Sequence, residues 1–118
     1  MVRIKLSTKT VPVVVETATG EELEMELCEM TAEARDKYLD VLATRMKIDA
    51  SGQVSGIKRY EGLQAELLSR CLRRKSDGNF VSLSEIQTWP SAAVSFLFQE
   101  AQILNHLGKE MAGMEKNE

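Results

Sequence analysis

Residues 89–108 read WPSAAVSFLFQEAQILNHLG and form the longest helical pattern in the chain. Pro90 suits the first position of a helix, where its missing N–H removes no hydrogen bond, and Gly108 suits the residue just past the end. At helical periodicity, one arc of this segment is apolar and is expected to lie in the core. That arc consists of Ala93, Val94, Leu97, Phe98, Ala101 and Leu104.

A second apolar arc lies on the same helix, beyond Glu100. It consists of Ala92, Phe96, Ile103 and Leu107. The remaining polar strip is narrow and consists of Ser91, Ser95, Gln99, Gln102 and His106. Two interpretations fit the second arc: it binds a partner or another copy of the chain, or other elements cover it and the whole helix is core. Its four residues are the candidate partner-binding site.

Residues 11–28, VPVVVETATGEELEMELC, predict an antiparallel β-hairpin. A β-branched run precedes a Thr-Ala-Thr-Gly turn, and apolar residues then alternate with glutamates, which is typical of a strand with one face in water. Val13 and Val15 are expected to share the buried face with the apolar residues of the second strand. Residues 2–6 alternate in the same way, so the sheet has either two strands or a third strand from this segment.

Helices are predicted between the hairpin and the long helix. Thr31 occupies an N-cap position before a helix over about 32–47. Residues 49–56, DASGQVSG, are rich in Ser and Gly and predict a mobile linker. The apolar face of a second helix consists of Tyr60, Leu63, Leu67, Leu68 and Cys71. Ser82 and Glu85 have the spacing of a capping box, which predicts a short helical turn.

The expected fold is α+β, with the hairpin packed on three main helices and the short helical turn. Trp89, between that turn and the long helix, is expected to plug the core and fix the angle between them. The long helix is expected to contact most of the others. Residues 1–108 are expected to form a single domain, and residues 109–118 a flexible C-terminal tail.

Composition limits the kinds of partner. The chain has 118 residues and a formal net charge of -3, which gives no general attraction to nucleic acid or anionic membranes. No apolar run has the length of a membrane span or signal peptide, so the expected location is the cytosol. Cys28 and Cys71 lack metal-site spacing and are expected to be buried free thiols rather than a disulfide or a metal pair.

Residue patterns for catalysis are sparse. His106 is the single histidine and falls on the polar strip of the long helix. The alternating glutamates of residues 22–26 share one strand face, which is explained more simply by a solvated edge strand. Around Gly78, an EF-hand register would place Arg73 and Lys75 at ligand positions, which excludes calcium. We expect no catalytic, cofactor or metal site, and the chain is not expected to be an enzyme.

Three blocks are informative together: YEGLQAELLSRCL (60–72), SDGNFVSLSEIQTWP (76–90) and SFLFQEAQILNHLG (95–108). Their order after an N-terminal hairpin resembles the tail assembly chaperones of long-tailed bacteriophages and prophages, over about Val13 to Gly108. The matching positions are packing and turn positions. They are Tyr60, Gly62, Leu63, Gln64, Cys71, Leu72, Asp77, Gly78, Glu85, Ile86, Trp89, Pro90, Phe98, Ala101, Leu104, Asn105, Leu107 and Gly108.

The resemblance implies a non-enzymatic chaperone that binds the tape-measure protein and is displaced as tail-tube subunits polymerise. A longer, frameshifted form often recruits the tail-tube protein in that family. Such a chaperone would form homo-oligomers, act in the bacterial cytoplasm and be absent from the mature virion. The alternative is a generic adaptor or regulatory module, linked to nucleic acid through a basic cluster. That cluster consists of Arg70, Arg73, Arg74 and Lys75.

Overall fold

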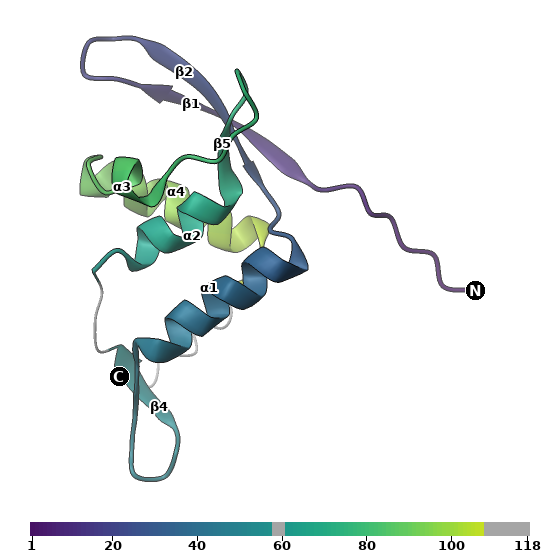
Figure 1. Ribbon diagram of the computed structural model, residues 1–118, viewed down its shortest axis with the longest axis vertical. Coiled ribbons are helices and arrows are strands. Elements are labelled where there is room, and N and C mark those ends of the chain that lie inside the picture. Colours follow the sequence, from purple (N-terminus) through teal and green to yellow (C-terminus); the bar gives the residue numbers. More distant parts are fainter. Residues whose placement is uncertain (58–60, 108–118) are drawn as a thin grey trace.

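The computed structural model describes residues 1–57 and 61–107, and it confirms the α+β class (Figure 1). Its elements in chain order are β1 (Thr10–Glu16), β2 (Glu22–Cys28), α1 (Ala32–Thr44), β3 (Met46–Ile48), β4 (Val54–Ile57), α2 (Leu63–Cys71), β5 (Leu72–Arg74), α3 (Leu83–Ile86) and α4 (Ser91–Leu104). The expectations for Tyr60, Gly108 and the tail 109–118 lie outside the described residues.

The β1–β2 hairpin has the predicted register. Val13 lies opposite Met25 and Val15 opposite Leu23, so these apolar side chains share the core face of the sheet. The third strand is β5, which pairs with β2 and gives the order β1-β2-β5. The sheet therefore does have a third strand, but residues 2–6 do not form it. The glutamates of β2 lie on the central strand of this sheet instead of at an edge.

Residues 46–57 form a second hairpin, where the sequence predicted a mobile linker over residues 49–56. Strands β3 and β4 are antiparallel, and the Asp49 carboxylate organises the turn by accepting hydrogen bonds from the Ser51 and Gln53 N–H groups. Thr31 caps α1 as predicted, its hydroxyl accepting from the Ala34 N–H at 3.2 Å. Helix α1 ends at Thr44, earlier than the predicted residue 47, because the chain enters β3 at Met46.

The most widely contacted helix is α2, not the last helix as predicted. It contacts α1, α3, α4 and β5, and Figure 1 shows it between the sheet and α1. Because Ala65 is buried as well as Leu67 and Leu68, α2 is covered on more than one side. The largest fully buried side chains of the core are Tyr38, Met25, Leu27, Leu67, Leu68, Leu72, Ile86, Val81 and Cys71.

Candidate partner-binding surface

The joint before α4 fixes how that helix lies on the core. The Ser82 hydroxyl accepts a hydrogen bond from the Glu85 N–H and starts α3, as the capping-box pattern predicted. Trp89 follows, half-buried and packed against the core, so it fills the joint only in part. Pro90 is the N-cap rather than the first helical residue, and its fixed φ of -57° leads the chain into α4 at Ser91.

The first arc of α4 faces the core as predicted. Val94, Leu97, Phe98 and Ala101 are buried, and Leu104 is partly buried against the same cluster. One member of this arc and one residue of the polar strip differ from the prediction. Ala93 is exposed at the start of the helix, and Gln102 of the polar strip is buried. Both α2 and β2 contact α4, so the buried side of the helix is wider than the apolar arc and includes Gln102.

The second arc is largely uncovered. Phe96 is 64% exposed and Ile103 is 68% exposed, and Ala92 is also exposed. With the exposed Gln99, these residues are spaced by four, three and four positions along the helix. This is the spacing with which one helix presents a seam to another helix. We call Ala92, Phe96, Gln99 and Ile103 the α4 seam; Gln99 was not among the predicted partner-binding residues.

Leu107 does not belong to the exposed arc: it is only 2% exposed and packs in the core. The helix ends at Leu104, and His106 takes a left-handed conformation with φ 58°. The Leu107 N–H then donates to the Gln102 carbonyl at 2.8 Å, and the His106 N–H donates to the Ile103 carbonyl at 3.2 Å. These two bonds form a Schellman motif, which turns the residue after the left-handed position back onto the helix. The prediction that Leu107 binds a partner is wrong for this reason.

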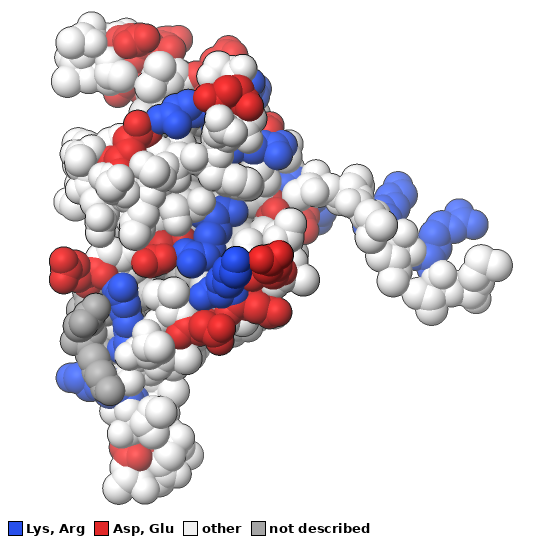
Figure 2. Space-filling model, in the orientation of Figure 1, with Lys and Arg blue, Asp and Glu red and all other residues white. Residues whose placement is uncertain are grey.

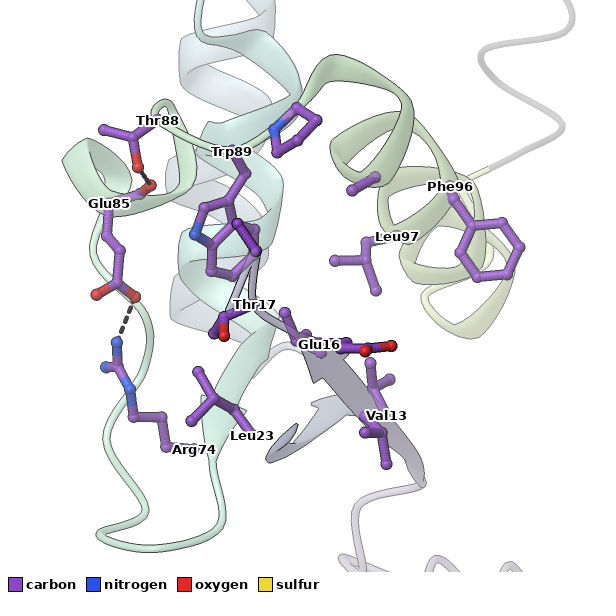
Figure 3. A pocket seen from close by; sticks show the side chains of 15 residues that line it. Val13, Glu16, Thr17, Leu23, Arg74, Glu85, Thr88, Trp89, Phe96 and Leu97 are labelled. Atoms are coloured by element: carbon purple, nitrogen blue, oxygen red, sulfur yellow. Dashed lines mark hydrogen bonds and ion pairs between the residues drawn. The ribbon is translucent and has the colours of Figure 1, made fainter. Parts of the chain in front are cut away.

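A groove of about 810 Å³ lies beside the seam, between α4 and the β1–β2 hairpin. Its apolar lining includes Val13, Val15, Leu23, Trp89, Phe96 and Leu97. In Figure 3, Leu97 points toward the hairpin and Phe96 lies at the outer rim, while the Arg74–Glu85 ion pair closes the side near Trp89. Sequence reasoning missed this groove, because it forms only when residues far apart in the chain are brought together.

The predicted basic cluster is largely neutralised. Arg70 pairs with Glu66 at 2.7 Å, Arg73 pairs with Glu26 at 2.5 Å, and Arg74 pairs with Glu85. The hydrogen bond from the Arg73 guanidinium to Glu26 raises the pKa of Arg73. In Figure 2, basic side chains lie beside acidic ones over the body of the molecule. Since paired guanidinium groups attract phosphates weakly, these contacts count against a nucleic-acid surface here.

Both cysteines are buried free thiols, as predicted. Burial raises the pKa of the Cys71 thiol to about 12, with a further contribution from Cys28. Burial also raises the pKa of Cys28, partly offset by Arg73. His106 is exposed beyond the end of α4 rather than on its polar strip. Among the described residues, no group of His, Cys, Asp and Glu side chains could hold a metal ion.

We expect both thiols to react slowly with Ellman's reagent in the folded protein at pH 8, because they are protonated and inaccessible. Two equivalents should react promptly in denaturant. The folded-state pKa of Cys71 lies above its ordinary value of 9.0. The contribution of its protonated thiol to the free energy of unfolding should therefore be fully present below pH 9 and should be lost as pH rises toward 12. A rapid one-equivalent burst from the native protein would contradict this expectation.

No helix within the described residues is long and apolar enough to cross a membrane. Comparisons with protein-family models, curated proteins and solved structures found no match to this chain.

Proposed function

We propose that this chain is a non-enzymatic tail assembly chaperone of a phage or prophage, which binds an apolar helical segment of the tape-measure protein. The observation that carries this proposal is the α4 seam. Phe96 and Ile103 expose most of their surface on one side of a helix whose opposite side is firmly held in the core. A rigid helix with such a seam suits the binding of an amphipathic helix, which would supply the missing apolar cover.

The chemistry of the described residues supports a binding role rather than a catalytic one. The two thiols are buried and hard to ionise, which makes them poor nucleophiles. His106 is exposed at the C-terminal end of α4, whereas both cysteines are buried. Acidic and basic groups that meet do so as ion pairs, within a helix for Arg70 with Glu66, within the sheet for Arg73 with Glu26, and between sheet and helix for Arg74 with Glu85.

The remaining parts of the proposal follow from the resemblance. The protein would act in the host cytoplasm, self-associate when no tape-measure protein is present, and leave before the virion is complete. A longer frameshifted form would bring the tail-tube protein to the complex. A tape-measure gene immediately downstream and a tube gene upstream are expected, and their absence would count heavily against the proposal.

The alternative is a general adaptor that presents the same seam to a different amphipathic helix. Its nucleic-acid version is the weaker one, because Arg70, Arg73 and Arg74 are engaged by glutamates. The two roles differ in which partner binds. Tape-measure fragments from the same genome should bind the seam if the chain is a chaperone, and should fail to bind if it is a different adaptor.

Replacing both Phe96 and Ile103 by Gln should weaken binding of a tape-measure fragment by about tenfold or more, because exposed aromatic and aliphatic anchors dominate such interfaces. Isothermal titration calorimetry with fragments tiled along the tape-measure protein would measure the loss. Thermal unfolding should remain cooperative, since both side chains are largely exposed already.

Glu100→Gln provides the control on the same helix, because Glu100 is exposed and lies off the seam. It should bind fragments like the natural chain. Unchanged binding by the Phe96/Ile103 double variant would contradict the proposed role of the seam. Loss of cooperative unfolding in that variant would instead show that the seam is part of the core.

A further inference from the structure

Residues 1–9 form an exposed arm that carries apolar side chains at alternating positions. Val2, Ile4 and Leu6 are 85%, 76% and 95% exposed. The arm leads away from the body of the molecule in Figure 1, and it has no helix or strand before Thr10. Its last residue is tied to the sheet, because the Lys9 carbonyl accepts from the Glu29 N–H at 3.1 Å. Such alternation is typical of a strand that has one apolar face.

The outer edge of β1 can accept a strand of this kind. Along a strand, successive residues direct their backbone groups to opposite sides, and Lys9 directs its carbonyl toward β2. Val14 and Glu16 therefore direct their N–H and C=O groups outward, and both residues are exposed. Among the described residues, no strand lies on that side of β1. Pro12 also faces the outer edge and has no N–H to donate, so the donors for an added strand come from Val14 and Glu16.

The two faces of β1 match the two faces of the arm. On the core side, Val13 and Val15 line the apolar groove that opens toward α4. On the other side, Glu16 lies beside Glu22 in the hairpin register, with Glu24 next along β2. Figure 2 shows acidic side chains at the hairpin and basic side chains on the arm. A strand that adds apolar residues on one face complements Val13 and Val15, and Arg3 and Lys5 on its other face complement Glu16, which neighbours the exposed Val14.

The arm is poorly placed to reach this edge within its own chain. Thr10 continues directly from Lys9 into β1, so the arm would have to reverse immediately before the strand. Ser7, Thr8 and Lys9 include no Gly, Asn, Asp or Pro, the residues that tight hairpin turns favour. A reversal at this point would also disturb the two hydrogen bonds between Lys9 and Glu29. The arm of a second copy can reach the outer edge of β1 without a chain reversal and without disturbing these hydrogen bonds.

We propose that residues 2–6 of one copy add as a strand to the outer edge of β1 in a second copy. Val2, Ile4 and Leu6 then cover the apolar groove, and Arg3 and Lys5 lie on the face that carries the glutamates. This self-association does not depend on which partner the α4 seam binds. The arm variants described next leave the seam unchanged, so failure of this proposal and failure of the chaperone proposal are distinguishable.

Analytical ultracentrifugation of the full chain over a range of concentrations tests the arm. The natural chain should self-associate, and the double variant Ile4→Gln/Leu6→Gln should do so about tenfold more weakly or worse, because it loses two apolar contacts. Ser7→Gln/Thr8→Gln is the matched control, which places the same two glutamines in the arm and keeps its apolar residues. It should associate like the natural chain.

Two further variants test the edge itself. Val14→Pro removes the outward N–H without breaking a bond to β2, so it should weaken self-association as the arm variant does. Val14→Ala keeps that N–H and should associate normally. Amide exchange of Val14 and Glu16 should slow with rising protein concentration. A natural chain that stays monomeric, or association that is unchanged in both the arm variant and Val14→Pro, would overturn the proposal.

Discussion

Leu107→Ala should lower the free energy of unfolding by about 2–4 kcal/mol, whereas Ile103→Ala should change it by less than about 0.5 kcal/mol. Both residues are apolar and lie near the end of α4, but Leu107 is 2% exposed and Ile103 is 68% exposed. Truncating Leu107 removes core contacts and leaves a cavity beneath the turn that follows the helix. Truncating Ile103 removes side-chain atoms that already contact water. Urea unfolding followed by circular dichroism measures both changes.

The same two variants separate stability from binding. Ile103→Ala should weaken tape-measure binding with an unchanged unfolding midpoint, and Leu107→Ala should shift the midpoint while the remaining folded protein binds normally. Equal destabilisation by both substitutions would mean that Ile103 is covered in solution. No destabilisation by Leu107→Ala would contradict the Schellman turn that places this side chain in the core.

The beginning and the core face of α4 could be predicted from local sequence. The Pro90 pattern and the spacing of Val94, Leu97, Phe98 and Ala101 place the start of the helix and its buried side, and the structure agrees. The exposed seam could also be predicted as an excess of apolar positions. Whether other elements cover these apolar positions could not be predicted from the sequence. Their coverage depends on where α2 and the hairpin lie in three dimensions.

The end of α4 could not be predicted by the usual residue preference. Gly108 was the expected terminator, since glycine adopts the left-handed conformation without strain. The structure uses His106 instead, with φ 58°. Because the helix ends earlier, Leu107 packs in the core. This packing involves residues far away in the sequence, so local helix propensity does not predict it. One apolar residue of the predicted binding arc was thereby misassigned.

The short strands were missed for a related reason. Strand β5 has three residues, Leu72–Arg74, and its pairing depends on the distant strand β2. Its two arginines belong to the predicted basic cluster, but Arg73 meets Glu26 across the sheet. The β3–β4 hairpin could have been suspected from Asp49, because an Asp before Ser and Gly is typical of a side-chain-capped turn.

Asn105→Ala should lower the free energy of unfolding by about 1–3 kcal/mol, because it leaves a backbone donor without its partner. The Asn105 Oδ1 accepts from the Met30 N–H at 2.7 Å, and its Nδ2 donates to the Ala101 carbonyl at 2.9 Å. The side chain is buried, and it joins the end of α4 to the connection between β2 and α1. Guanidinium denaturation and amide exchange at Met30 measure the loss.

Asn79→Ala is the matched control, since Asn79 is exposed in the turn after β5. It should change stability by less than about 0.5 kcal/mol. If Asn105→Ala leaves the Met30 amide as protected as before, the hydrogen bond between Asn105 and the β2–α1 connection contributes nothing to stability. The rigid placement of the α4 seam would then depend on apolar packing alone.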